Sequence, residues 1–203
     1  MEMTVSQFLE ALSGKAAVPG GGSVAALCGS LSAALGSMAT NLTSGKKKYA
    51  QYQEDIERLL AESQRLCREF EELMEQDAAA FLPLSKAYSI PKTDPDRPTI
   101  MEEALRTASA APAAVIETSA QLLAILEELV GKCSVLVVSD VGVAAACCRC
   151  AAESALLNVC INTKMMADRA YAGALEEKAV AGTQDTAQRS QRIYAAVLAS
   201  LRK

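Results

Sequence analysis

The sequence contains no histidine and no tryptophan, and aromatic residues make up only 4% of its 203 residues. The absence of histidine removes the commonest metal ligand and the side chain best suited to proton transfer near neutral pH. Any acid or base in a reaction must therefore be Asp, Glu, Lys, Tyr or Cys. With so few aromatic residues, the hydrophobic share of 51% comes mainly from Ala, Leu and Val. That composition is typical of tightly packed helices and unlike a β-sandwich.

The chain carries a net charge of −4, and charged residues make up 22% of it. Sequence-independent binding of nucleic acid needs a concentrated basic face, so nucleic acid is a poor candidate partner. A length of 203 residues is that of one domain with a substantial core. We therefore expect a single helical domain over residues 1–203.

Cysteine is present seven times, an odd number, and three of the seven lie close together, Cys147, Cys148 and Cys150. This run contains a CxxC spacing but no histidine and no second pair, so core packing is favoured over a metal or redox role. The first residues, Met1–Thr4, carry no basic segment, and no signal peptide is expected. We therefore expect free thiols and a cytoplasmic location.

Residues 24–42 carry no charge and are predicted to be a buried helix. Small residues occur on every face of it and allow a neighbouring backbone to come close. A membrane span is the competing interpretation, but the hydroxyls, the glycines and Asn41 favour a buried helix, and no membrane is expected as a partner. The segment Pro19–Ser23 precedes this helix, and Ser23 is the candidate N-cap.

A second, nearly uncharged helix is expected over residues 141–166, with Ser139 and Asp140 as its caps. The preceding residues 135–138 are too short and apolar to classify, and form either a strand or a buried turn. A helix N-terminus offers unpaired N–H groups and a partial positive charge, so the polar turns before both uncharged helices are candidate ligand sites. For the glycine segment, the alternative is a flexible loop with an N-cap.

Residues 49–88 give the clearest periodic pattern in the sequence. Asp77 lies within this pattern, where it either pairs with a lysine to fix the helix register or lines a cavity. In a cavity, burial would raise its pKa and suit it to acid–base chemistry. The pattern is the 4-3 spacing of a coiled-coil seam, and its members are Tyr52, Ile56, Leu59, Ser63, Leu66, Phe70, Leu73, Asp77, Ala80 and Leu84.

Three further helices are predicted from capping patterns and amphipathic spacing, and a proline-containing loop separates the second of them from the seam helix. They cover residues 5–14 with Thr4 and Gln7 as a capping box, residues 99–129 with Thr99 and Glu102 as a second box and Gly131 beyond, and residues 183–201.

Three adjacent lysines, Lys46, Lys47 and Lys48, follow the first uncharged helix. They are either a solvated helix end that complements the helix dipole or a binding site for a polyanionic group.

Six segments together resemble the cyclodeaminase/cyclohydrolase family, the family of the cyclodeaminase part of formiminotransferase-cyclodeaminase and of bacterial methenyltetrahydrofolate cyclohydrolases. The resemblance runs from about Val5 to the last helix. The segments that carry it are Pro19–Ala26, Ala39–Tyr49, Asp77–Phe81, Ala87–Lys92, Ser139–Ala145 and Leu157–Asn162.

The resemblance implies an all-α antiparallel bundle of long helices that forms a homodimer and binds a reduced, polyglutamylated folate in a cleft near the subunit interface. It implies the conversion of 5-formiminotetrahydrofolate to 5,10-methenyltetrahydrofolate with release of ammonia. The alternative reaction is hydrolysis of 5,10-methenyltetrahydrofolate to 10-formyltetrahydrofolate. Both pass through a tetrahedral carbon between N5 and N10, and neither needs a metal or a redox cofactor.

The site residues that the resemblance suggests fall into two groups. Asp140, Asp77 and Lys47 are the candidate catalytic residues. The candidate substrate-binding residues are Gly20, Gly21, Gly22, Ser23, Asn41, Lys46, Lys48, Ser139 and Asn158. Lys46 to Lys48 would either meet the glutamate tail or stabilise the surroundings of the departing amine, and Gly20 to Ser23 would let the substrate approach the backbone.

The segment Gly131–Val138 departs from the family pattern, which usually has Gly-Asn and a shorter approach to the Ser-Asp turn. This departure is the one feature that supports a function of a different class, a non-catalytic dimeric helical scaffold.

Overall fold

The computed structural model describes residues 3–202, and within that range it contains six α-helices, one short 3-10 helix and no strand. This confirms the predicted all-α class and the antiparallel bundle of long helices. The elements are α1 (Val5–Ser13), α2 (Gly21–Asn41), η1 (Lys47–Tyr52), α3 (Gln53–Tyr88), α4 (Arg97–Lys132), α5 (Val138–Thr163) and α6 (Arg169–Leu201).

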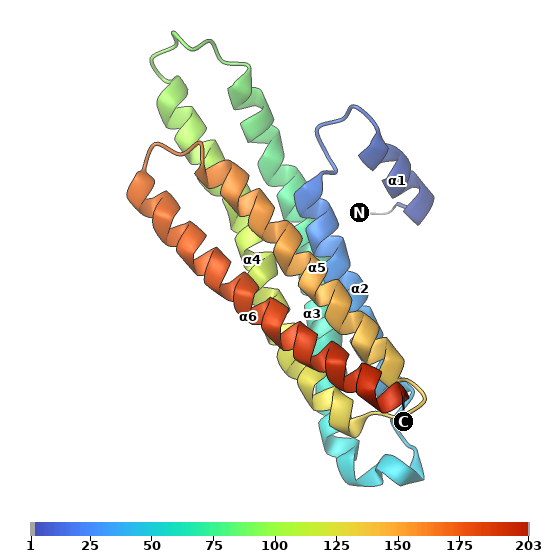
Figure 1. Ribbon diagram of the computed structural model, residues 1–203. Coiled ribbons are helices and arrows are strands. Elements are labelled where there is room, and N and C mark those ends of the chain that lie inside the picture. Colours follow the sequence, from blue (N-terminus) through green and yellow to red (C-terminus); the bar gives the residue numbers. More distant parts are fainter. Residues whose placement is uncertain (1–2, 203) are drawn as a thin grey trace.

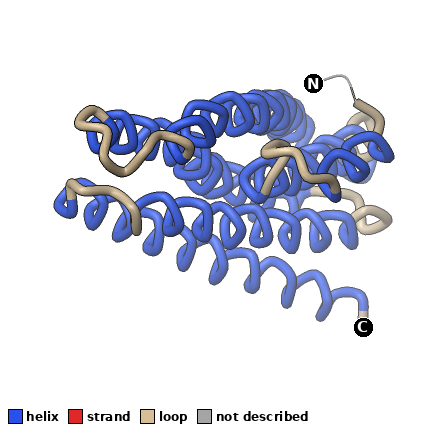
Figure 2. The backbone as a smooth tube through the Cα atoms, turned by 90° about the horizontal axis from the view of Figure 1, so that it is seen from above, coloured by secondary structure: helices blue, strands red, loops and turns tan. Residues whose placement is uncertain are grey.

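Helices α2 to α6 run side by side along one axis, each antiparallel to the next (Figure 1). We call the end where α2 begins the glycine end, because it contains Gly20–Gly22. The opposite end, where α2 stops and η1 starts, is called the lysine end, because it contains Lys46–Lys48. Seen from above, the helices form layers, with α6 splaying away from the others toward its C-terminus (Figure 2).

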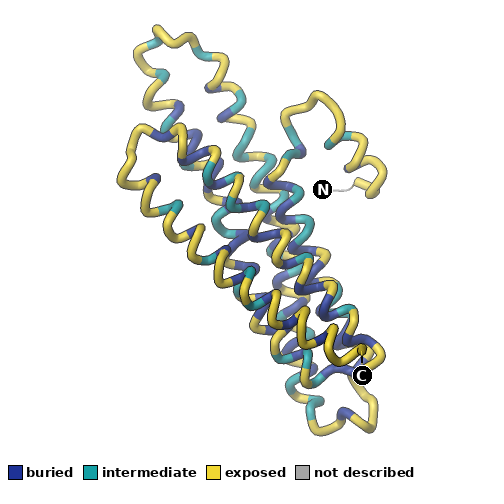
Figure 3. Tube along the Cα trace, viewed as in Figure 1, coloured by how far each residue is buried: buried dark blue, intermediate teal, exposed yellow. Residues whose placement is uncertain are grey.

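Helix α1 lies beside the bundle, and most of its surface is exposed (Figure 3). It begins as the sequence predicts, because the Thr4 hydroxyl accepts a hydrogen bond from the Gln7 N–H at 3.2 Å and the Gln7 side chain accepts one from the Thr4 N–H at 2.8 Å. Phe8 is the one residue of α1 that is buried. The capping box is therefore confirmed.

The seam predicted for residues 49–88 is confirmed in α3, where its apolar members from Ile56 to Leu73 are buried. Phe70 packs directly against α2, and a Cβ built on Gly29 would lie 2.3 Å from the Phe70 ring. Ser32 on the same helix donates a hydrogen bond to the Ala144 carbonyl of α5 at 2.7 Å. Small residues on α2 thus let it pack closely against both α3 and α5.

The predicted N-caps of the two uncharged helices are wrong. Helix α2 begins at Gly21 with Gly20 as its N-cap, and Ser23 lies inside the first turn, where its hydroxyl binds another helix. Helix α5 begins at Val138, so Ser139 and Asp140 also lie within its first turn. The residues before it form a turn rather than a strand.

The second predicted capping box is also wrong, because Glu102 forms contacts outside its own helix. α4 begins at Arg97, two residues before Thr99. The Glu102 carboxylate accepts a hydrogen bond from the Ala167 N–H at 2.6 Å and forms an ion pair with Arg106 at 3.1 Å. Helix α4 also continues through Gly131 to Lys132 instead of stopping before the glycine.

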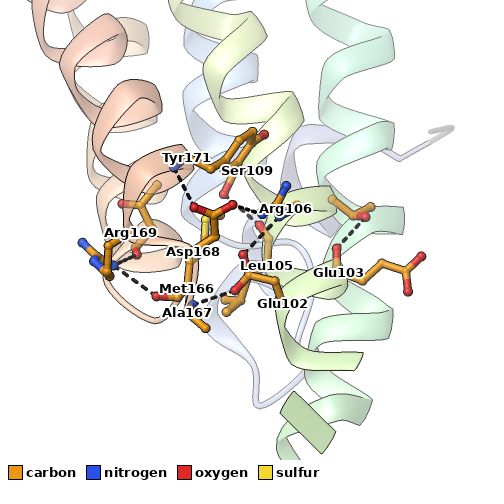
Figure 4. Close-up of polar contacts among 12 residues, drawn as sticks. Glu102, Glu103, Leu105, Arg106, Ser109, Met166, Ala167, Asp168, Arg169 and Tyr171 are labelled. Atoms are coloured by element: carbon orange, nitrogen blue, oxygen red, sulfur yellow. Dashed lines mark hydrogen bonds and ion pairs between the residues drawn. The ribbon is translucent and has the colours of Figure 1, made fainter. Parts of the chain in front are cut away.

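A polar cluster around Arg106 ties α4 to the turn between α5 and α6 (Figure 4). Arg106 pairs with Asp168 at 2.7 Å and lies 4.2 Å from the centre of the Tyr171 ring. Asp168 caps α6 by accepting the Tyr171 N–H at 3.0 Å. This cap starts α6 at Arg169, earlier than residue 183 where the sequence predicts it.

By length and composition alone, α2, α4 and α5 could each cross a membrane. In the bundle the long apolar stretches of these helices have another physical cause, since each helix packs against at least three neighbouring helices. A helix enclosed on several sides needs apolar residues around most of its circumference.

Replacing Gly29 by Ala tests the close packing of α2 on α3. Because the new methyl group would overlap the Phe70 ring, we expect the free energy of unfolding to fall by about 1–3 kcal/mol. Gly131→Ala is the matched control, since nothing lies within 4 Å of a Cβ at that helical position, and it should leave stability unchanged or raise it. Urea denaturation measures both, and equal effects would contradict the packing argument.

Candidate active site

Asp77 of α3 meets the first turn of α2 at the glycine end. The Ser23 hydroxyl donates a hydrogen bond to Asp77 Oδ2 at 2.9 Å. Burial raises the pKa of the Asp77 carboxyl, and hydrogen bonds from the side chain and backbone of Ser23 oppose that rise. The carboxyl is therefore protonated over a wider pH range than an exposed one, as a group that donates a proton requires.

Two glycines make room for this contact. A Cβ on Gly22 would lie 2.0 Å from Asp77 Oδ1, so no other residue fits there without moving the carboxyl. A Cβ on Gly21 would lie 3.2 Å from the side-chain nitrogen and oxygen of Asn158 on α5, whose Nδ2 donates to the Ser154 carbonyl. Gly20 has open space around it and serves as the N-cap. The structure therefore brings Gly20–Ser23, Asp77 and Asn158 together.

The lysine end gathers most of the other predicted residues. Lys46 Nζ donates to the Ser134 hydroxyl at 3.2 Å, and Lys48 Nζ lies 5.8 Å from the centre of the Tyr49 ring. Asn41 ends α2, while Ser139 and Asp140 lie in the first turn of α5. The set at this end is Asn41, Lys46, Lys47, Lys48, Ser139 and Asp140.

The segment that departs from the family pattern belongs to the lysine end. The Ser134 N–H donates to the Thr43 hydroxyl at 2.8 Å, and the Val135 N–H donates to the Tyr49 hydroxyl at 3.0 Å. Leu136 is 79% exposed. The segment 131–138 is thus anchored to the turn that carries the lysines and presents an apolar side chain to solvent.

The two groups of predicted residues do not meet within one chain. Ser23 and Asn41 are 18 positions apart on α2, which at 1.5 Å per residue separates the two ends by about 27 Å. Asp140 and Asn158 are separated by the same number of positions on α5. The alternative in which Asp77 pairs with one of the lysines to fix register is therefore wrong.

A groove between α2 and α3 lies on the path from one end to the other. One cavity of about 870 Å³ is lined by Asn41, Met38 and Arg68 among others. A second of about 460 Å³ is lined by Leu27, Glu71 and Glu72, and it shares Arg68 with the first. The larger cavity adjoins Asn41 but not Asp77, so neither cavity holds both candidate groups.

An apolar face on α2 and α5 was not recognised from the sequence. Each helix carries a second 4-3 seam that points away from the bundle, and Cys28 and Cys150, whose sulfur atoms are 3.8 Å apart, join the two seams. Its members are half-buried or exposed: Val24, Cys28, Leu31, Leu35, Met38 and Leu42 on one helix, and Val143, Cys147, Cys150, Ser154, Leu157 and Ile161 on the other. Small residues and the scarcity of charge on both helices hide this spacing in the sequence.

Among residues 3–202, no group of three or more Cys, Asp or Glu side chains is arranged to hold a metal ion. Of the cysteine run, Cys148 is buried as a core residue, but Cys147 is half-buried and Cys150 is exposed. Core packing therefore describes only part of that run.

Ser23→Ala tests the contact at the glycine end. Because the Ser23 hydrogen bond lowers the pKa of Asp77 against the effect of burial, its removal should raise that pKa further. A carbon-13 NMR titration of the carboxyl measures the change, with Asp77→Asn identifying the signal. Ser30→Ala is the control, since the Ser30 hydroxyl binds only the Ala26 carbonyl of its own helix. A pKa that does not rise in Ser23→Ala would contradict the assignment.

Comparison with known proteins gives consistent results in sequence and in structure. Residues 4–181 match the formiminotransferase-cyclodeaminase family. Methenyltetrahydrofolate cyclohydrolase of Methylorubrum extorquens is 38% identical over 83% of this chain and 83% of its own length. Formimidoyltransferase-cyclodeaminase of Mus musculus is 32% identical over 84% of this chain, which spans about a third, 32%, of that longer protein.

The structural comparison extends over nearly the whole chain. The crystal structure of formiminotetrahydrofolate cyclodeaminase from Thermotoga maritima superposes with a TM-score of 0.84 at 25% identity, and covers 97% of this chain and 98% of that one. The resemblance that the motifs indicate is therefore confirmed, and the chain belongs to the formiminotransferase-cyclodeaminase family of enzymes.

Proposed function

We propose that this chain is a cytoplasmic folate cyclodeaminase that converts 5-formiminotetrahydrofolate to 5,10-methenyltetrahydrofolate and ammonia. The observation that carries the proposal is Asp77, a carboxyl whose pKa is raised by burial and which Ser23 holds at the N-terminus of α2. The family and the cyclodeaminase of similar fold support it.

The chemistry needs a proton at one defined step. N10 of the folate attacks the formimino carbon and forms a tetrahedral carbon that carries an amino group between N5 and N10. That amino group leaves as ammonia only after it gains a proton. A protonated Asp77 supplies this proton, and the resulting carboxylate keeps its hydrogen bond from Ser23.

Hydrolysis of 5,10-methenyltetrahydrofolate to 10-formyltetrahydrofolate is the second candidate reaction. The 38% identity to the Methylorubrum extorquens cyclohydrolase, which is of comparable length, favours it. In that reaction the attacking water loses a proton, so Asp77 would act in its deprotonated form. The two reactions therefore require opposite protonation states of the same side chain.

A second copy of this chain is the proposed occupant of the α2–α5 face. The face carries two parallel rows of apolar residues at 4-3 spacing, and three of its members, Leu157, Ile161 and Leu31, are 71%, 57% and 52% exposed. Two such faces together form a four-helix bundle in which each seam packs against its counterpart. The two-fold axis of the resulting homodimer passes through the middle of the face.

An axis perpendicular to the helices completes the site. It places the glycine end of one copy against the lysine end of the other. The two groups of residues, which lie about 27 Å apart within each chain, then meet across the interface between the chains. Charge favours this orientation, since Glu71 and Glu72 border the groove nearer the glycine end, while Lys46–Lys48 mark the other end. Asp77 then faces a partner's Asp140 group, and two composite sites form.

Within the composite site the lysine end has a binding role. Lys47 and Lys48 carry positive charge beside the exposed end of the groove, which suits the γ-linked carboxylates of a polyglutamylated folate. Ser139, Asp140 and Asn41 are the polar groups that would contact the pterin from the second copy. The anchored segment 131–138 sets the depth of this half of the site. No metal or redox cofactor takes part in the proposed reaction.

Asp77→Asn tests the site, and the pH dependence of the wild type separates the two reactions. We expect turnover to fall by about 10²–10⁴-fold, as for loss of a general acid or base, measured by the absorbance of methenyltetrahydrofolate together with ammonia release. In the wild type, cyclodeaminase activity should fall as pH rises through the pKa of Asp77, whereas catalysed hydrolysis should rise. A folded wild-type protein that catalyses neither reaction would support the scaffold alternative.

The same substitution has a defined effect on stability. The folded state holds the Asp77 proton more tightly than the unfolded state does, because its folded pKa is raised. The free energy of unfolding of the wild type should therefore decrease, relative to Asp77→Asn, as pH rises from below the unfolded pKa to above the folded pKa. Denaturation of both proteins across that pH range measures the difference, and an increase would contradict burial of the carboxyl.

Mixing two inactive variants tests the composite site. Asp77→Asn and Asp140→Asn should each be inactive alone, because every site lacks one group. Random exchange of subunits makes half of the dimers mixed, and one of their two sites is intact, so the mixture should recover about a quarter of wild-type activity.

Recovery of activity should depend on the α2–α5 face. Leu157→Glu added to both variants should prevent it, whereas Val180→Glu on exposed α6 should not. Absence of recovery in folded dimers that exchange subunits would contradict the arrangement.

A further inference from the structure

A pair of thiols lies in the α2–α5 face, outside the groups assigned to the reaction. The sulfur atoms of Cys28 on α2 and Cys150 on α5 are 3.8 Å apart. Cys150 is exposed and Cys28 is half-buried, and both are reduced. The two residues belong to different helices and are 122 positions apart, so their contact depends on the packing of α2 against α5.

The surroundings of the pair favour a bond between these two thiols. Helices α2 and α5 approach closely here through small residues, as the Ser32 to Ala144 hydrogen bond shows. A disulfide needs its sulfur atoms about 2.05 Å apart, so the present separation of 3.8 Å must shorten when the bond forms. The Cys150 sulfur also lies 3.9 Å from the Ser154 hydroxyl. Cys147 is on the same face, but no contact within hydrogen-bonding distance joins it to Cys28.

We propose that Cys28 and Cys150 are a redox pair that a hydroperoxide oxidises to an intrachain disulfide in the separated chain, and that assembly of two chains through the α2–α5 face protects. The first half stands on the sulfur contact and the exposure of Cys150. The second half rests on the proposed function, because it uses the same face as the dimer.

The oxidation balances with one peroxide per disulfide. The Cys150 thiol attacks the peroxide, the O–O bond breaks, and the products are a sulfenic acid and an alcohol or water. The Cys28 thiol then attacks the Cys150 sulfur, an S–S bond forms, and water leaves. Burial, followed by the neighbouring Cys150 thiol, raises the pKa of Cys28 to about 12, so Cys28 is the resolving partner and not the thiol that reacts first.

The pair reports whether the composite site is assembled. In the dimer, the second copy covers Cys150 and excludes the oxidant. In the separated chain, the site is incomplete and the thiol is exposed. Oxidation therefore marks chains that cannot catalyse, and it leaves assembled, active enzyme unmodified.

Peroxide treatment of the full-length reduced protein tests the pair. In dilute samples, where sedimentation shows separated chains, hydrogen peroxide should remove two of the seven alkylatable thiols. Non-reducing peptide mass spectrometry should then identify a Cys28–Cys150 link. In Cys28→Ser, Cys150 should remain as a sulfenic acid that dimedone traps. Cys160→Ser is the matched control for another half-buried thiol of α5 and should still form the link.

Concentration separates this proposal from the proposed function. The rate of disulfide formation should fall in proportion to the fraction of chains that sedimentation shows as dimers, and Leu157→Glu should oxidise at the full rate at every concentration. Persistence of both thiols in separated chains, or a Cys147–Cys150 link, would overturn the pair. Equal rates in dimers and separated chains would overturn the protection alone. A chain that never dimerises would refute the composite site. The peptide mass spectrometry would still show whether Cys28 and Cys150 form a disulfide.

Discussion

The close approach of α2 to its neighbours is the constraint on which the rest of the structure depends. Gly22 lets the Asp77 carboxyl reach the first turn of α2. Gly29, seven residues further along α2, lets the Phe70 ring pack against the helix. On the other side, Ser32 bonds the backbone of α5. A helix that packs this closely cannot carry long side chains on its inner faces, so its apolar side chains of larger size point outward. The close packing of α2 thus determines the packing of the core, the position of the Asp77 carboxyl and the exposed apolar seam.

The sequence predicts the fold well where a pattern is local and periodic. The α3 seam and the Thr4–Gln7 box are confirmed because spacing and capping depend on nearby residues. Helix starts without a side-chain cap were predicted wrongly. Ser23 was assigned to its own helix as a cap, but its hydroxyl instead bonds Asp77, 54 positions away. No local rule predicts a partner so distant.

The candidate site shows the same division. The sequence predicts each site residue from its own segment, and the grouping of Asp77 with Gly20–Ser23 and Asn158 follows once α3 and α5 are placed against α2. The separation of Lys46–Lys48 from Asp77 could not be seen in the sequence, because it depends on which ends of antiparallel helices coincide. The α2–α5 seam is not evident in the sequence, because α2 carries no charge and α5 carries only Asp140, Arg149 and Glu153. Neither helix therefore has a continuous polar face against which an apolar stripe stands out.

Helix α2 carries a member of each group on one continuous rod, with Ser23 in its first turn and Asn41 at its last residue. In the proposed dimer, both junctions are therefore set by a single alignment of the two rods. A slip of one residue along the seam displaces both junctions together by about 1.5 Å, and no local adjustment at one of them corrects the other. The geometry of both sites depends on the same alignment of the two helices, so both sites form together or neither forms.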